Sequence, residues 1–294
     1  MAVGTLDVAV RRAPGRTRRL AATFRRHPTF VIGLAALALI ATTAVLVPVL
    51  PLPDAMDMNP AQRLRPPSLA HPFGTDNFGR DVFARALWGS QISMMVGFGV
   101  AVLSTMIGLV IGIVSGFYRA ADAVIMRIMD AMMSVPAILL AIALVSINKP
   151  GLVTIIAAIT LVEIPRVVRV VRATVLTIRE QTYIEAAISV GTRPLKLLFS
   201  HVLPNAMAPI IVQSTFICAV AVLIEASLSF LGAGTPPELP SWGNMMASAR
   251  PHIHQAPWML LLPGALLSAT VLSINMVGDG LRDMLDPRFA RRLG

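Results

Sequence analysis

The chain has 294 residues, of which 55% are hydrophobic and 14% charged, and its mean hydropathy of +0.73 is too high for a soluble domain with a polar surface. The net charge of +10 does not indicate nucleic-acid binding, because the arginines lie at the ends of apolar runs instead of along one polar stripe. The single cysteine, Cys218, excludes an intrachain disulfide and a cysteine metal cluster.

An arginine-rich arm, residues 1–28, comes before the first apolar run at 29–50. A positively charged arm followed by an apolar run resembles a signal peptide. The run is longer than a signal-peptide core, however, and Pro48, Pro51 and Pro53 occupy the place where a cleavage site would follow. We therefore expect an uncleaved membrane anchor.

About six runs are long and apolar enough to span a membrane. They are 29–50, 93–117, 123–147, 152–171, 206–231 and 258–277. Lipid offers no hydrogen-bond partner to a backbone amide, so each run is expected to be a helix. The predicted fold is an all-α integral membrane protein. Pro136 and Pro209 lie inside the third and fifth runs and are expected to kink these helices without ending them.

Basic residues gather in alternate connections, which sets the expected orientation. With the N-terminus inside, most of the 25 lysines and arginines fall on the cytoplasmic side, so both termini are predicted to be cytoplasmic. The predicted transmembrane domain covers 29–290 and is followed by a tail at 291–294. It includes an outer loop at 51–91 and an inner loop at 172–205 that are too long to be simple turns.

The inner loop is expected to form two short amphipathic helices outside the bilayer. Ala186 and Ala187 are small enough to allow close approach by another protein surface, and Gly191 suits a left-handed helix end. Thr192 and Pro194 fit the cap and first turn of the next short helix. The pattern predicts a helix–turn–helix that fits a groove, and an ordinary interfacial loop is the alternative.

The outer loop contains a polar segment next to the second span. It consists of Gly74, Thr75, Asp76, Asn77, Phe78, Gly79, Arg80 and Asp81. We interpret its charged residues as a helix cap and an ion pair that fix the loop, and a substrate entry is the alternative. Glu163 and Arg166 are expected to pair near the inner boundary. Glu225 lies late in the fifth run, where it either lines a pore or makes a helix–helix hydrogen bond.

Two further polar groups are candidate sites. Asp279, Arg282 and Asp283 are spaced one helical turn apart and are expected to pair at the inner interface. His252 and His254, near Met245 and Met246, suggest a metal site at first. They lack a third well-spaced ligand, so exposed loop histidines are the preferred interpretation and no metal is expected.

The sequence carries no motif for ATP chemistry of its own. The only lysines, Lys149 and Lys196, do not belong to a Gly-Lys-Ser/Thr phosphate loop, and no catalytic triad or carboxylate pair is evident. A membrane-embedded enzyme is thereby disfavoured. A proton-coupled transporter that uses Glu163 and Glu225 is a rival interpretation, but it predicts broken helices in two inverted halves, which the sequence does not show.

The spacing of the inner loop resembles the EAA loop of bacterial ABC importer permeases. The matching residues are Glu185, Ala186, Ala187, Gly191, Leu203 and Pro204. His201 departs from the isoleucine usual in that family. The segments 74–81, 225–232 and 278–283, with Asp286-Pro287-Arg288, are similar to the C-type permeases of dipeptide and oligopeptide importers, and the resemblance covers about 28–290.

The resemblance implies a type I permease fold in the bacterial inner membrane. It implies a pore-forming subunit, without a cofactor of its own, that works with a B-type sister permease, one or two ABC ATPases that bind ATP and Mg, and an external solute-binding protein. The EAA loop would couple it to the ATPase. Dipeptides and oligopeptides are the expected substrates, with nickel chelates, glutathione and opines as alternatives. Besides these proteins, only membrane lipid is expected as a partner, and no nucleic acid.

Overall fold

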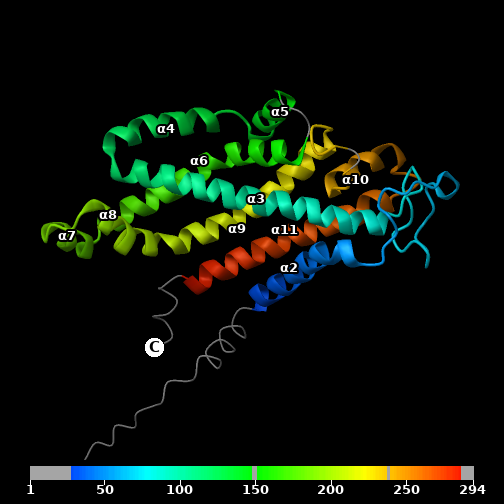
Figure 1. Ribbon diagram of the computed structural model, residues 1–294, viewed down its shortest axis with the longest axis horizontal. Coiled ribbons are helices and arrows are strands. Elements are labelled where there is room, and N and C mark those ends of the chain that lie inside the picture. Colours follow the sequence, from blue (N-terminus) through cyan, green and yellow to red (C-terminus); the bar gives the residue numbers. More distant parts are fainter. Residues whose placement is uncertain (1–27, 148–150, 237–238, 286–294) are drawn as a thin grey trace, which may run out of the picture.

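The computed structural model describes residues 28–147, 151–236 and 239–285. These residues are almost entirely helical, and within them the only β pairing is an isolated bridge between Thr75 and Asp81. The long helices run along one common direction, so that the described part of the chain is an elongated bundle (Figure 1). Residues 1–27 of the N-terminal arm, Lys149, Asp286-Pro287-Arg288 and the tail at 291–294 lie outside the described residues.

Five long helices make up the bundle. They are α2 (Pro28–Leu46, extended by the 3-10 turn Val47–Val49), α3 (Val82–Phe117), α6 (Leu152–Arg179), α9 (Leu203–Phe230) and α11 (Trp258–Leu285). The shorter helices are α4 (Arg119–Met133), α5 (Ala137–Ile147), α7 (Thr182–Ser189), α8 (Pro194–Leu197) and α10 (Trp242–Ala249). The π-helical turn Leu198–Val202 joins α8 to α9, and the 3-10 turns Pro60–Gln62 and Arg250–His252 lie at the opposite end.

Four stretches are long and apolar enough to cross a membrane, and a fifth is added if α4 and α5 count as one bent span. The four are Pro28–Val49, Val82–Phe117, Pro194–Phe230 and Trp258–Leu285. The predicted span at 152–171 forms a helix, α6, but Glu163, Arg166 and Arg169 make it more charged than the others. The predicted total of six spans is therefore not confirmed, whereas the all-α membrane fold is.

The prediction for Pro136 was wrong. The chain breaks between Met133 and Ala137, and α4 and α5 meet there at 90°. Pro136 disfavours helical geometry in the residue before it, so the helix ends at this point instead of only kinking. Pro209 lies inside α9 as predicted.

The core of the bundle is centred on close packing between α3 and α6. Three glycines at every fourth position of α3 face three buried valines of α6. They are Gly108, Gly112 and Gly116, opposite Val167, Val171 and Val175. A Cβ atom placed on Gly112 would lie 2.6 Å from Val171 Cβ, so the two helices approach each other more closely than any larger residue allows.

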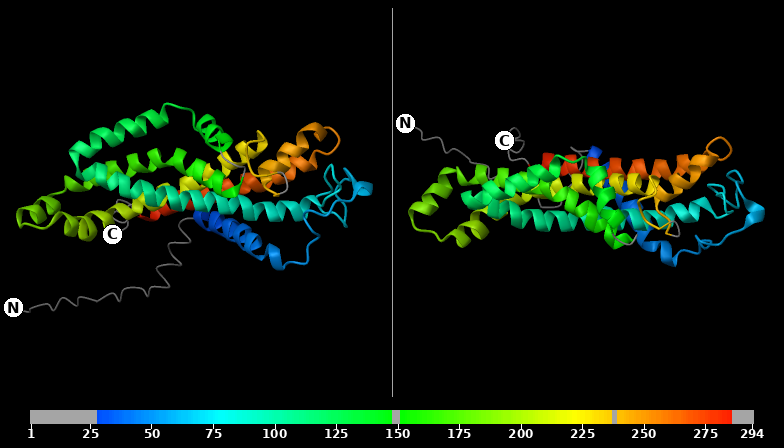
Figure 2. Two further views of the ribbon diagram at one scale, coloured as in Figure 1. Left: turned by 45° about the horizontal axis from the view of Figure 1, so that its top comes forward. Right: turned by 90° about the horizontal axis from the view of Figure 1, so that it is seen from above.

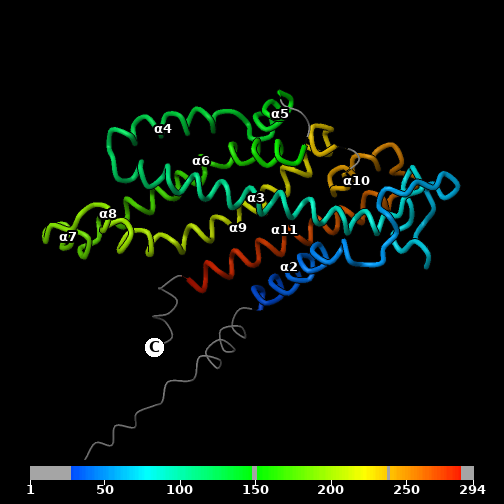
Figure 3. Tube along the Cα trace, viewed as in Figure 1, coloured from blue at the N-terminus to red at the C-terminus, as the bar shows by residue number. Residues whose placement is uncertain are grey.

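The connections separate into two ends of the bundle. Figure 2 shows α7 and α8 projecting from one end, while the outer loop and α10 lie at the other. The trace in Figure 3 runs back and forth between these ends, so that α2 begins and α11 ends on the side of α7. Segments predicted to share one side of the membrane therefore lie on the same side of the bundle.

Candidate functional site

The inner tip, defined as residues 182–202, begins with α7. This helix carries Glu185, Ala186 and Ala187, of which the first two are exposed. Ile184 points the other way and is fully buried in the main hydrophobic core. Because one face of α7 is anchored and the opposite face is open, α7 presents a fixed surface beyond the end of the bundle.

Gly191 reverses the chain after α7. Its φ of +83° is left-handed, as predicted from the sequence. Its N–H donates to Ile188 O at 2.9 Å, and the next N–H, of Thr192, donates to Ala187 O at 3.1 Å. These two bonds close the helix end.

The second short helix begins differently from the prediction. Arg193 occupies the cap position of α8 and no side chain caps the helix, so the capping role expected of Thr192 was wrong. Pro194 is the first residue of α8, as predicted. Leu203 and Pro204 are not part of a loop, because α8 passes through the π-helical turn directly into α9.

The inner tip exposes an apolar surface. Val190 is 88% exposed and Leu195 70% exposed, and Tyr183, Ile188 and Phe199 are exposed beside them. Leu195 and Phe199 belong to the apolar stretch Pro194–Phe230, whereas Tyr183, Ile188 and Val190 come before it. Large apolar side chains that stand outside the spans are unfavourable in water.

At the outer end, Asp76 organises the polar segment. Its Oδ1 accepts hydrogen bonds from the backbone N–H of Phe78 at 2.8 Å and of Arg80 at 3.0 Å, and its Oδ2 pairs with Arg80 Nε at 2.7 Å. Asp81 caps α3 by accepting from Ala84 N at 2.8 Å. The predicted cap and ion pair are therefore confirmed.

Arg85, one turn into α3, was missed by the sequence prediction. Its Nε lies 3.8 Å from Asp76 Oδ2, and its Nη1 donates to Ala55 O at 2.9 Å. A lone arginine early in a long apolar helix was the available signal. The segment is held further by Thr75, whose hydroxyl accepts from Arg65 N at 2.9 Å, and by Gly79, where a Cβ would lie 1.8 Å from Asn59 O.

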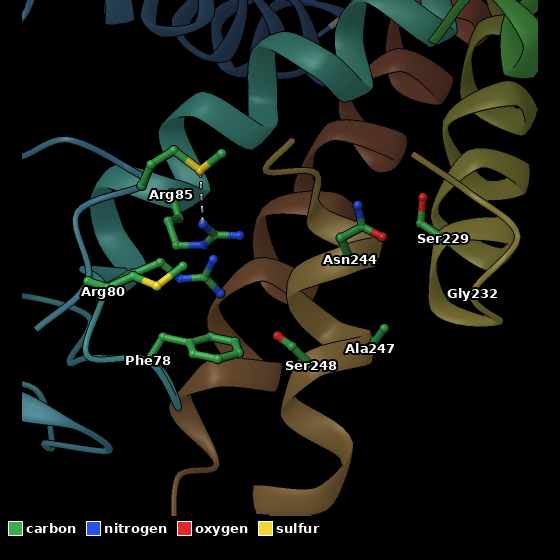
Figure 4. Close-up of a pocket in the computed structure, with 10 residues that line it drawn as sticks. Phe78, Arg80, Arg85, Ser229, Gly232, Asn244, Ala247 and Ser248 are labelled. Atoms are coloured by element: carbon green, nitrogen blue, oxygen red, sulfur yellow. Dashed lines mark hydrogen bonds between the residues drawn. The ribbon is translucent and has the colours of Figure 1, made fainter. Parts of the chain in front are cut away.

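A pocket of about 420 Å³, which we call the outer pocket, opens beside these arginines. Figure 4 shows Phe78, Arg80 and Arg85 on one side of it, and α10 with the end of α9 on the other. Its lining residues are Met56, Met58, Phe78, Arg80, Arg85, Ser229, Gly232, Asn244, Ala247 and Ser248. The pocket thus combines two cations with mostly apolar walls.

Glu225 is fully buried beside this region and reaches no opening. Its Oε2 accepts from Ser93 Oγ of α3 at 3.2 Å, and its Oε1 accepts from Ser229 Oγ at 2.8 Å. Of the two alternatives left by the sequence, this geometry matches the helix–helix hydrogen bond.

Other expected pairs have mixed outcomes. Glu163 and Arg166 form the predicted ion pair at 3.0 Å. Within the described part of the chain, Asp279 and Asp283 form no ion pair with Arg282, which lines a recess between α6, α9 and α11. No group of three metal-ligating side chains occurs among the described residues, and His252 and His254 lie in an outer turn.

A bundle of helices long and apolar enough to cross a membrane, with two short helices beyond one end, defines a polytopic membrane protein. The model of the family "binding-protein-dependent transport system inner membrane component" matches residues 104–291, and that of the N-terminal TM domain of oligopeptide transport permease C matches residues 16–67. The chain belongs to the family of binding-protein-dependent transport system inner membrane components. It is a permease of this type, not an ATPase.

Similar proteins cover nearly the whole chain. A putative peptide transport system permease protein of Brucella abortus is 46% identical over 90% of this chain and 89% of its own length. A dipeptide transport system permease protein of Alkalihalophilus pseudofirmus is 41% identical over 90% and 87%. The inward-facing methionine ABC transporter shares the fold, with a TM-score of 0.58 and 21% identity over 67% of this chain and 94% of that one.

Proposed function

We propose that this chain is a pore-forming permease subunit of an ATP-driven importer of short peptides in the bacterial inner membrane. The observation that carries the proposal is the inner tip, where Tyr183, Ile188 and Val190 are exposed and lie outside the candidate spans, so that a protein partner would cover them. The family of the chain supplies the class of that partner, an ABC ATPase. Glu185, Ala186, Ala187 and Gly191 would form the surface that seats in it, and Leu203 and Pro204 would begin the helix that carries the movement inward.

The inner tip is well connected to the bundle. Ile184 packs into the core formed by α3, α6 and α9, and Leu197 and Val202 are buried in the same cluster. α8 continues into α9, which has 28 residues and is therefore about 42 Å long. A displacement of α7 by the ATPase would thus reach the opposite end of the bundle through a continuous helix.

The remaining partners follow from the division of labour in such a machine. A second permease of the B type would complete the translocation path, one or two ATPase subunits would bind ATP and Mg, and an external solute-binding protein would deliver the cargo. This chain would bind no cofactor itself. The outer loop and α10, at the end opposite to α7, form the surface that the binding protein would meet.

Peptides are favoured over nickel chelates, glutathione and opines by the names of the similar permeases and by the apolar, methionine-containing outer pocket, since methionine adapts to side chains of many shapes. Among the described residues, His252 and His254 are the one local feature that favours nickel. Changing both to alanine should leave uptake of a labelled dipeptide nearly unchanged. Loss of uptake in this variant, or accumulation of chelated nickel without dipeptide, would favour the metal cargo.

Cross-linking of the assembled complex tests the proposed coupling. In a background with Cys218→Ala, we expect Ala186→Cys to cross-link to the ATPase subunit and Arg63→Cys, in the outer loop, to leave it unlinked. Both positions are exposed, so reactivity of the thiol does not distinguish them. Equal ATPase cross-linking at the two positions, or none at Ala186→Cys in a complex that retains the ATPase, would refute the assignment of α7.

A further inference from the structure

Two buried arginines lie side by side in the wall of the outer pocket, and their charge is only half neutralised. Arg80 is 6% exposed and Arg85 3% exposed. Among the described residues, Asp76 is the one carboxylate within ion-pair distance of either arginine. Its Oδ2 lies 2.7 Å from Arg80 Nε and 3.8 Å from Arg85 Nε. Two cations and one anion leave a net positive charge in a site that is largely removed from water.

The guanidinium groups also have hydrogen-bond donors to spare. A guanidinium carries five N–H donors. Arg80 uses Nε for Asp76 and lies over the ring of Phe78 at 4.7 Å. Arg85 uses Nη1 for Ala55 O at 2.9 Å and, more weakly, for Met56 Sδ at 4.0 Å, the contact dashed in Figure 4. Within the described part of the chain, neither Nη atom of Arg80 nor Nη2 of Arg85 has a hydrogen-bond partner. Figure 4 shows both groups pointing across the pocket toward α10.

The opposite wall suits the rest of a small zwitterion. Ser248 directs its hydroxyl into the pocket toward Phe78 (Figure 4). The hydroxyl already donates to Met245 O at 2.8 Å, so its lone pairs remain available to accept. Met58 and Ala247 add apolar surface, and the volume of about 420 Å³ is within the range of small-molecule sites.

We propose that the outer pocket is a carboxylate site in which Arg80 and Arg85 receive the C-terminal carboxylate of the incoming peptide. This inference rests on the proposed function. The C-terminal carboxylate is common to linear peptides whatever their side chains, so a site that reads it accepts variable cargo. The planar fork of arginine matches a carboxylate, and one carboxylate cancels the excess charge. Asp76 and Ala55 O hold the guanidinium groups in place before the cargo arrives, which lowers the entropy lost on binding.

Binding of an acid and its amide to the assembled complex, without the binding protein, tests the inference. The probes are labelled Ala-Phe and Ala-phenylalaninamide, measured by equilibrium dialysis against the complex in nanodiscs. Hydrogen bonds to a charged group are worth enough to give the acid at least about tenfold tighter binding than the amide. Arg85→Gln should remove most of this preference, and Arg85→Lys should keep part of it. Arg63→Gln, which removes the same charge from an exposed position of the outer loop, should bind as wild type does.

A second variant guards against misfolding of Arg85→Gln. Ala247→Phe narrows the pocket from α10 without replacing either arginine, and it should weaken binding of both probes. An acid preference that survives in Arg85→Gln would overturn the inference, and so would unchanged binding in Ala247→Phe. If Arg85→Gln weakens only the association of the loaded binding protein, the site takes a carboxylate of that protein and the inference is wrong. A wild-type complex that transports dipeptide yet binds acid and amide equally refutes this inference alone, whereas one that transports no dipeptide refutes the proposed function.

Discussion

Replacing Gly191 by valine should uncouple transport from ATP hydrolysis. A Cβ at this position would meet no atom within 4 Å, so the substitution creates no clash and acts through the backbone alone. At a φ of +83°, a residue other than glycine costs about 1–3 kcal/mol, and a β-branched residue belongs at the upper end of this range. If the chain relaxes to a negative φ, the two bonds that close α7 are lost and α7 no longer faces its groove.

About 2–3 kcal/mol corresponds to a roughly 30- to 150-fold shift in the population of the docked geometry. We therefore expect Gly191→Val to reduce peptide uptake and the stimulation of ATPase activity by loaded binding protein at least about tenfold, with normal membrane insertion. Gly191→Asn should be milder, because asparagine tolerates the left-handed region. Gly151→Val is the matched control, since Gly151 also has open space around it but is extended, with a φ of 174°. Wild-type uptake and ATPase stimulation in Gly191→Val would refute the reasoning.

Two further substitutions test the packing that positions these sites. Asp76→Ala leaves the buried arginines without a counter-charge, which should cost about 3–5 kcal/mol of folding stability. We expect a lower melting temperature of the purified complex and faster proteolysis of the outer loop. Asp57→Ala, at an exposed position, should match wild type, and equal behaviour of the two variants would contradict the charge argument. Gly112→Ala places a Cβ 2.6 Å from Val171, whereas Gly99→Ala meets nothing closer than 3.5 Å. Only Gly112→Ala should lower the melting temperature, because overpacking costs about 1–3 kcal/mol of folding stability. Equal melting temperatures of the two variants would show that α3 and α6 separate freely.

The inner tip could be predicted in detail because its signals are local. A helix-end glycine, or a proline in the first turn of a helix, determines the backbone conformation of only the few residues around it. The small residues of α7 likewise affect only the surface next to them. The prediction that Thr192 caps α8 was wrong although it also used a local signal. The backbone N–H of Thr192 takes part in closing α7, and the cap position of α8 falls on the next residue, Arg193. Apolar runs likewise predicted where the long helices lie.

Features that depend on distant residues could not be predicted. The break at Pro136 turns α5 away from α4, and the sequence does not say whether a proline kinks a helix or ends it. Arg172 pairs with Asp122 at 2.6 Å across 50 residues, a contact that follows from the packing of α4 on α6. The pairing of Arg85 with Asp76 depends in the same way on how the outer loop folds over α3.

Uptake by the reconstituted complex tests the central claim most directly. The chain, its sister permease and the ATPase subunits are placed in proteoliposomes, with the binding protein and a labelled dipeptide on the outer face and ATP on the ATPase face. We predict accumulation of the dipeptide that requires both ATP and the binding protein and that falls at least about tenfold in Gly191→Val. Accumulation driven by a proton gradient without ATP would contradict this account and favour a secondary transporter.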